Sequence, residues 1–297
     1  MKYFSLFSGI GGFELGIQYA YDNRPDLWNR NQNLQQDMSY NKKSSDRLTC
    51  VGFSEIDKYA IATYQSHFPE HKNYGDITKI NEQELPDFDL LVGGFPCQTF
   101  SIAGKRKGFE DTRGTMFFEI ARILRAKQPR LFVLENVKGL LSHDNGNTFR
   151  TIIATLDELG YDLQWQVLNS KNHGVPQNRE RVFIIGHLRG TSRPEVFPFT
   201  STNDSHIKLT TQSVQQQDRT ISPEGISPCL ASNTTFDKWN VDFGEMKIRR
   251  LTPTECERLQ GFPDNWTAGV SDTQRYKQCG NAVTVNVIRD IFIKLTI

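Results

Sequence analysis

Cys97 has the surroundings of a nucleophile. It follows an apolar run and two glycines in the stretch LLVGGFPCQ, residues 90–98. The apolar run has the length of a buried strand, the glycines allow unusual backbone angles, and Pro96 stiffens the chain immediately before the thiol. A thiolate held at a strand end can attack an electrophilic carbon. Taken alone, the segment is also compatible with a buried structural cysteine.

Three ionisable residues are candidates to assist this thiol. Glu135 follows a predicted strand at residues 131–134, and open α/β sheets bind ligands at the carboxyl ends of their strands. We therefore expect Glu135 and Cys97 to face one pocket. Arg179 and Arg181 stand two positions apart on a predicted strand, so they should point the same way. They would contact a carboxylate, a phosphate or a base edge, or else form paired surface charges.

The N-terminus predicts a strand, a glycine turn and a helix. Residues 2–7 have the strand pattern, SGIGG at 8–12 is the turn, and Leu15, Ile17 and Tyr21 mark a helix face. Such a turn offers bare backbone amides to a ligand, but it lacks the spacing of a dinucleotide or phosphate loop. A nucleotide-like ligand without phosphates is favoured over a merely structural turn.

Acidic residues follow the next predicted elements. A strand at residues 50–54 leads into Glu55, where nucleotide-binding sheets use a carboxylate to hold ribose hydroxyls, and Asp76 follows further on. Each acid alone is more typical of a loop charge or a helix cap. Their succession at strand ends favours a binding role.

Composition excludes several classes of protein. The chain has 297 residues, 37% hydrophobic and 23% charged, with five cysteines and a net charge of +1. An odd number of cysteines without metal-ligand spacing predicts free thiols, no disulfide and no bound metal. No apolar run reaches the ~20 residues that span a bilayer, so we expect a cytoplasmic protein without a membrane partner. Because the net charge is only +1, the attraction to a nucleic-acid partner would have to come from local basic clusters.

Other segments should position these residues. A glycine-rich basic loop at 99–115 carries Lys105, Arg106 and Lys107, which are either solvated charges or a clamp that closes over a polyanion.

His67 and His71 are interpreted as ordinary surface residues, because Pro69 interrupts the helix that would align them. The remaining expected elements are a polar surface insertion (22–49), helices at 116–126 and 148–159, a strand at 163–168, an irregular or β-rich segment (188–247), a capped helix from Thr252 to Gly261, and a final helix at 281–295.

The ordered set of motifs resembles bacterial DNA cytosine-5 methyltransferases of the restriction-modification type. The resemblance covers nearly the whole chain and departs in the polar insertion and in the variable segment, where Cys229 and Leu230 replace a frequent Thr-Leu pair. The motifs are FSGIGG (7–12), EID (55–57), GDI (75–77), GFPCQ (94–98), ENV (135–137), QNRER (177–181), RLTP (250–253), RLQGFP (258–263) and GN (280–281).

The resemblance implies an α/β fold, the Rossmann-like sheet of S-adenosylmethionine-dependent methyltransferases, with a small irregular or β-rich target-recognition domain. The expected division is a catalytic and cofactor-binding domain at 1–187, the small domain at 188–276, and a C-terminal helix at 277–297 that returns to the catalytic domain.

The resemblance also implies a mechanism. Cys97 would add to carbon 6 of a cytosine, and Glu135 would protonate or hydrogen-bond ring nitrogen 3. Arg181 would hold the base carbonyl oxygen, and Arg179 would order the site or contact a phosphate.

The implied cofactor is S-adenosyl-L-methionine, with S-adenosyl-L-homocysteine as product. Phe7 would stack on adenine, Glu55 would hold the ribose, Asp76 the adenine amine, and Asn281 would help to close the pocket. The other expected cofactor contacts are Gly9, Gly11, Gly12, Ile56, Ile77, Pro96 and Val283.

The implied substrate is double-stranded DNA, with the target base flipped out of the duplex. The implied enzyme is a monomer, and a cognate endonuclease would be encoded separately. Residues 188–247 would read about four to six base pairs, since each base contact is worth ~1–3 kcal/mol and few fit. The expected DNA contacts are Gln98, Ser101, Lys105, Arg106, Lys107, Arg219, Asn233, Thr235 and Lys238.

Two other functions remain open at this point. A tRNA cytosine-5 methyltransferase shares the fold, but those relatives usually carry a Cys-Phe-Thr tripeptide that this chain lacks. A catalytically silent DNA-binding regulator is the second, and the presence of Cys97, Glu135 and Arg181 argues against it.

Overall fold

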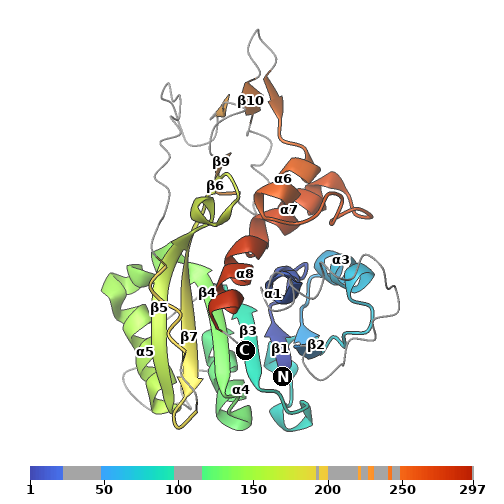
Figure 1. The fold of residues 1–297 in the computed structure, drawn as a ribbon. Helices are drawn as coiled ribbons and strands as arrows, with labels where there is room; N and C mark the ends of the chain where they lie inside the picture. Colours follow the sequence, from blue (N-terminus) through green and yellow to red (C-terminus); the bar gives the residue numbers. More distant parts are fainter. Residues whose placement is uncertain are drawn as a thin grey trace, which may run out of the picture.

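The fold is built on a mixed sheet of six strands in the order β2-β1-β3-β4-β7-β5 (Figure 1). The computed structural model describes residues 1–22, 48–96, 116–191, 194–199, 220–221, 227–230, 240–242 and 248–295. The first four strands in this order run parallel, whereas β7 is antiparallel to both of its neighbours. The strands are β1 (Lys2–Leu6), β2 (Thr49–Ser54), β3 (Leu90–Gly94), β4 (Leu131–Val137), β5 (Tyr161–Asn169) and β7 (Glu180–Leu188).

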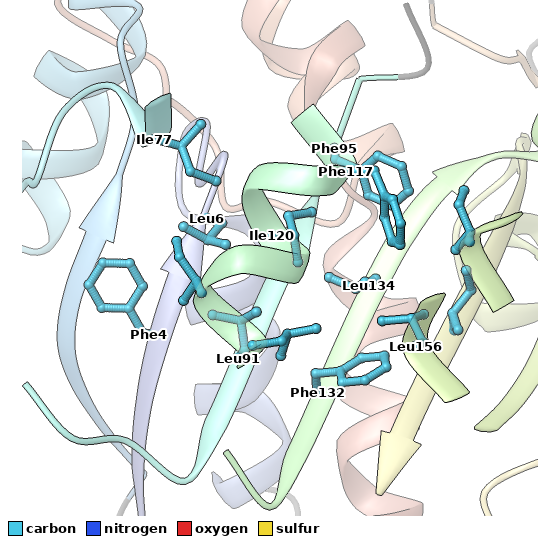
Figure 2. Packing of buried hydrophobic residues seen from close by; sticks show 14 of the residues in the cluster. Phe4, Leu6, Ile77, Leu91, Phe95, Phe117, Ile120, Phe132, Leu134 and Leu156 are labelled. Carbon is cyan, nitrogen blue, oxygen red and sulfur yellow. The ribbon is translucent and has the colours of Figure 1, made fainter. Parts of the chain in front are cut away.

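Helices α4 (Met116–Lys127) and α5 (Asn147–Glu158) pack on one face of this sheet. Apolar residues of α4 recur at helical spacing, which makes one continuous buried stripe. Figure 2 shows Phe117 and Ile120 of this stripe among Leu6, Leu91 and Leu134, which come from three neighbouring strands. The predicted helices at 116–126 and 148–159 are confirmed.

Helices α1 (Gly12–Asp22) and α8 (Val285–Lys294) pack on the opposite face and against each other. Their close approach depends on Gly16, because a Cβ atom there would lie 2.5 Å from the Cβ of Ile288 and 2.9 Å from the carbonyl oxygen of Val285. Two core clusters therefore sandwich the sheet between helices, as expected for this class of α/β fold.

A smaller part of the molecule lies above the sheet in Figure 1. Its described residues contain short strands and two helices, and no helix lies between 188 and 247 in the described part of that segment. The elements are β6 (Gln177–Asn178), β8 (Thr220–Ile221), β9 (Ser227–Pro228), β10 (Asn240–Asp242), β11 (Ile248–Arg250), α6 (Pro253–Leu259) and α7 (Asp272–Asn281). Beside β2 lies α3 (Lys58–His67), and the 3-10 turns are η2 (Ile77–Lys79), η3 (Glu82–Glu84), η4 (Lys138–Leu141), η5 (His143–Gly146) and η6 (Ser170–His173).

The end of the chain differs from the sequence-based prediction. The capping box at Thr252 and Glu255 is confirmed, and α6 ends at Leu259, two residues before the expected Gly261. The predicted final helix is present from Val285 to Lys294 as α8, but its expected start at Asn281 is wrong, because Asn281 ends α7. Helix α7 is polar throughout, so it gives no apolar periodicity, and it also runs across the expected domain boundary at 276.

Two smaller predictions also need correction. Arg179 lies between β6 and β7, so it does not share a strand with Arg181. His67 is exposed, as expected of a surface residue, although its ring stacks on Trp266, whereas His71 is half-buried and hydrogen-bonded to the Tyr64 hydroxyl at 2.9 Å. The polar insertion falls almost wholly outside the described residues.

Two classes of feature are absent from the described residues. None of their helices has the length and apolar character to cross a membrane. Among the same residues, no three His, Cys, Asp or Glu side chains gather as a metal site would require.

Glu14 is an unusual charge in the core, at the start of α1. Its side chain is only 2% exposed. Burial raises its pKa to about 7. The folded protein therefore holds a proton here that the unfolded chain releases at lower pH.

This buried acid predicts a pH-dependent stability. A raised folded-state pKa stabilises the fold fully below about pH 4.5 and loses that contribution as the pH rises through about 7. Glu14→Gln removes the titration, so the wild type should lose up to ~3 kcal/mol of unfolding free energy relative to this variant between pH 5 and 8. Urea unfolding across this range measures it, with exposed Glu84→Gln as the control. Parallel pH curves for the wild type and Glu14→Gln would refute the assignment.

Candidate active site

A cavity of about 640 Å³ opens beside the carboxyl ends of β1, β3 and β4. Its size lies within the range of roughly 300–1,000 Å³ that is usual for small-molecule sites. The lining residues come from all parts of the chain: Phe7, Gly9, Ile10, Glu55, Asp57, Ala60, Gly94, Phe95, Pro96, Glu135, Asn136, Val137, Arg179, Arg181, Cys229, Leu230, Lys277, Gln278, Gly280 and Asn281.

The N-terminal glycine turn forms one wall. Phe7 and Gly9 have positive φ angles of 52° and 55°, so the chain bends sharply where β1 ends. The Gly9 amide donates a hydrogen bond of 2.9 Å to Glu55 Oε2, and the amides of Ile56 and Asp57 donate to Oε1 at 2.8 and 2.9 Å. Three of the roughly four acceptor positions of this carboxylate are thus used, which fixes its orientation and leaves about one for a ligand.

The side chain of Trp266 stabilises the N-terminal glycine turn. Its Nε1 donates a hydrogen bond of 2.8 Å to the carbonyl of Ile10. Its ring stacks on His67 with centroids 3.5 Å apart, and His67 Nε2 is hydrogen-bonded to the Trp266 carbonyl at 2.7 Å. The sequence analysis missed Trp266, because no local pattern connects residue 266 with residue 10.

Glu135 and Arg181 meet through the antiparallel pairing of β4 and β7. The register places Val137 opposite Arg181, and Arg181 Nε lies 3.0 Å from Glu135 Oε1. Gly94 on the neighbouring strand leaves room for the acid, since a Cβ atom there would lie 2.9 Å from Glu135 Oε2. The expectation that Glu135 faces the pocket is confirmed.

The environment of Glu135 favours its protonated form. Burial raises the pKa of its carboxyl group, and the positive charges of Arg181 and Arg179 lower it by a smaller amount. A raised pKa increases the protonated fraction of a carboxyl group at a given pH, which favours donation of a proton or a hydrogen bond.

Arg179 is buried and makes its hydrogen bonds to other segments of the chain. Its Nη2 donates to the carbonyls of Gly280 and Ala282 at 3.2 and 2.8 Å, and its Nη1 donates to Cys229 Sγ and the Leu230 carbonyl at 3.2 and 3.1 Å. Burial lowers the pKa of this guanidinium. Both arginines line the cavity and both donate to Cys229 Sγ, but only Arg181 pairs with Glu135, so the expectation that they point the same way is only partly met.

An ion pair that the sequence analysis did not single out lies at the cavity wall. Lys277 Nζ is 2.8 Å from Asp57 Oδ2, and Asp57 Oδ1 accepts a hydrogen bond from the Tyr59 amide at the start of α3. Partial burial acts to raise the pKa of Asp57, but hydrogen bonds from Lys277 and the helix amides lower it.

Asn136 fixes the chain that leads to Cys97. Its amide nitrogen donates a hydrogen bond of 2.9 Å to the carbonyl of Phe95, and its side chain is buried. The next residue, Pro96, lines the cavity and is the last described residue before 97.

The expected cofactor residues fall into two groups. Phe7, Gly9, Glu55, Pro96 and Asn281 line the cavity. Six others do not belong to that lining. Gly11 packs on Phe68, and Gly12 and Val283 pack on each other. Ile56 is 72% exposed, Asp76 accepts hydrogen bonds from Thr78, and the Ile77 side chain lies in the core.

The predicted nucleophile and the predicted DNA contacts lie outside the described residues. These are Cys97, Gln98, Ser101, Lys105, Arg106, Lys107, Arg219, Asn233, Thr235 and Lys238.

The comparisons with known proteins agree on one family. Residues 1–221 and 208–296 match the family model described as C-5 cytosine-specific DNA methylase. The chain is 39% identical, over 99% of its length and 77% of the relative's, to the type II methyltransferase M1.ScrFI of Lactococcus lactis subsp. cremoris. It is 35% identical to the type II methyltransferase M.HhaI of Haemophilus parahaemolyticus, over 98% of this chain and 93% of that protein.

Solved structures share the fold at lower identity. A mutant of DNMT2 from Spodoptera frugiperda superimposes with a TM-score of 0.71 at 19% identity, over 100% of this chain and 99% of that one. A putative DNA modification methyltransferase encoded within an Escherichia coli prophage gives 0.65 at 19% identity, over 100% and 98%.

The support of the glycine turn can be tested. Trp266→Phe keeps an aromatic ring but removes the donor to the Ile10 carbonyl, so the free energy of unfolding should fall by ~1 kcal/mol or more. The matched control is Trp165→Phe, at a side chain that is 48% exposed on the edge strand β5. Denaturant unfolding of both variants measures the difference. Equal effects would show that the indole hydrogen bond does not stabilise the fold.

Proposed function

Since this chain belongs to the C-5 cytosine-specific DNA methylase family, we propose that it transfers a methyl group to carbon 5 of a cytosine in double-stranded DNA. The observation that carries this function is the contact of Glu135 with Arg181 in a cavity that Pro96 also lines, one residue before Cys97. An acid with a raised pKa, a cation and a thiol are what nucleophilic activation of cytosine requires.

The residues divide the chemistry among them. Carbon 5 of cytosine is a poor nucleophile, so Cys97 adds to carbon 6 as a thiolate and makes an enamine of the ring. Electron density then moves toward ring nitrogen 3, where Glu135 supplies a proton or a hydrogen bond, and Arg181 holds the carbonyl oxygen of the base. After methyl transfer, loss of the proton from carbon 5 and expulsion of Cys97 restore the aromatic ring.

The cavity suits S-adenosyl-L-methionine as the methyl donor. Glu55 has an oriented carboxylate for a ribose diol, Phe7 lines the same cavity, and Ile56, the residue after Glu55, has an exposed apolar side chain. This cofactor, when bound, supplies a methyl group on a sulfonium centre. Asn281 lines the same cavity and is proposed to help close it, while Gly12 and Val283 support the turn by packing on each other.

DNA would meet this cavity from the side of the small domain. We assign residues 1–187 to catalysis and cofactor binding, 188–276 to target recognition, and 277–297 to the return to the catalytic domain. The target base is flipped into the pocket, the basic residues 105–107 attract phosphates, and residues 188–247 read the sequence. Arg179 takes the role of ordering the site, since both of its terminal nitrogens donate to groups within the protein.

The family relatives suggest the biological role. They include several type II methyltransferases, so this enzyme is proposed to protect DNA against a separately encoded endonuclease, as a cytoplasmic monomer. The likeness to DNMT2 structures, at 19% identity, concerns the fold and does not favour tRNA as the substrate.

The covalent step gives a direct test. In the presence of S-adenosyl-L-methionine, duplex DNA that carries 5-fluorocytosine at the target should form a denaturation-resistant adduct with the wild type, because after methyl transfer carbon 5 has fluorine in place of the proton that must leave. Cys97→Ser should abolish both the adduct and methyl transfer but retain cofactor binding. Gel electrophoresis under denaturing conditions detects the adduct, and Cys50→Ser, at a free thiol outside the cavity lining, is the matched control. An adduct that survives in Cys97→Ser would exclude Cys97 as the nucleophile.

The role of Glu135 gives a second test. Glu135→Gln keeps the shape of the side chain but cannot donate a carboxyl proton, so kcat should fall by about 10²–10⁴-fold. Cofactor affinity should change by less than about threefold, since the proton matters chiefly as the ring is attacked. Single-turnover kinetics and calorimetry measure the two quantities. Equal losses in both would move Glu135 to a binding role.

A further inference from the structure

Arg179 joins two segments that serve different ligands. Its four hydrogen-bond acceptors are Cys229 Sγ and the Leu230 carbonyl on one side, and the carbonyls of Gly280 and Ala282 on the other. The first pair belongs to the variable segment to which DNA recognition is assigned. The second pair flanks Asn281, which lines the proposed cofactor cavity.

The burial of Arg179 makes these contacts interdependent. The side chain is 2% exposed, so water cannot replace a lost acceptor. A buried cation that loses half of its partners costs several kcal/mol. Because the guanidinium is a rigid planar fork, it also fixes the distance between the two pairs of acceptors. One segment is therefore held best when the other is in place.

A buried amide beside Arg179 strengthens the same junction. Gln177 is fully buried, and its Oε1 accepts a hydrogen bond of 3.1 Å from the Leu230 amide, while its Nε2 donates to the Leu259 carbonyl at 2.7 Å. Gln260 in turn donates to the Cys279 carbonyl at 2.6 Å. The recognition segment, the end of α6 and the end of α7 are thus connected by fully buried polar side chains.

We propose that Arg179 is a positioning residue that couples the two substrates. Cofactor binding at Gly280–Ala282 stabilises the conformation of Cys229–Leu230 that binds DNA, and DNA binding stabilises the conformation of Gly280–Ala282 that binds the cofactor. This coupling rests on the proposed function, which assigns cofactor and DNA to these segments. By linkage each ligand raises the affinity of the other by the same factor, and typical coupling between sites is about 5–150-fold.

The test measures this factor in the whole protein. Calorimetry gives the Kd of S-adenosyl-L-homocysteine without and with a 20-base-pair duplex that carries the sequence found methylated by the wild type. Arg179→Lys keeps the charge but loses the fork, so the ratio of the two Kd values should fall from about tenfold or more to near one. The control is Arg258→Lys, whose side chain is 63% exposed and pairs with Asp264; it should keep the wild-type ratio.

A second pair of variants keeps the test decisive if Arg179→Lys does not fold. Cys229→Ser retains an acceptor for Arg179, whereas Cys229→Ala removes it, so only the alanine variant should lower the ratio. The inference is overturned if Arg179→Lys keeps the full ratio, or if the alanine and serine variants behave alike. A wild type that binds the cofactor and methylates DNA without any coupling would also overturn it, and would leave the proposed function intact. A wild type that neither binds the cofactor nor methylates DNA would instead refute the proposed function.

Discussion

The antiparallel insertion of β7 between β4 and β5 is the constraint on which the active site depends. Parallel strands alone would bring only carboxyl ends to the ligand-binding edge of the sheet. Because β7 runs the other way, its first residues reach that same edge, and Arg181 lies beside Glu135 across the pair. The acid and its cationic partner are thus positioned by main-chain register, which is far stiffer than a loop.

Around this pair, glycine and backbone amides shape the cavity more than side chains do. Gly94 leaves space for the Glu135 carboxyl group, and Gly16 lets α1 and α8 approach closely on the opposite face. Three amides fix the carboxylate of Glu55. The polar groups of the cavity are therefore oriented before a ligand arrives, so little reorganisation is left for the reaction.

The sequence predicted the features that depend on local patterns of residues. Most strand and helix positions in residues 1–191 followed from apolar periodicity, although helix α3 was not predicted, and Glu135 was assigned to the cavity because it follows a buried apolar run. Contacts between distant segments were not predictable. Trp266 contacts a turn 256 positions earlier, and α7 is held by polar contacts such as the ion pair of Arg275 with buried Glu257. Neither leaves a periodic signal.

The acceptors that Arg179 uses in the recognition segment bear on how such a chain diversifies. One is the main-chain carbonyl of Leu230, which any amino acid at that position would provide. Arg179 therefore holds this segment partly through its main chain, and that contact does not restrict which side chain stands at position 230. Side chains of that segment that make no such contact are then free to change over generations, while the contact with Arg179 stays the same.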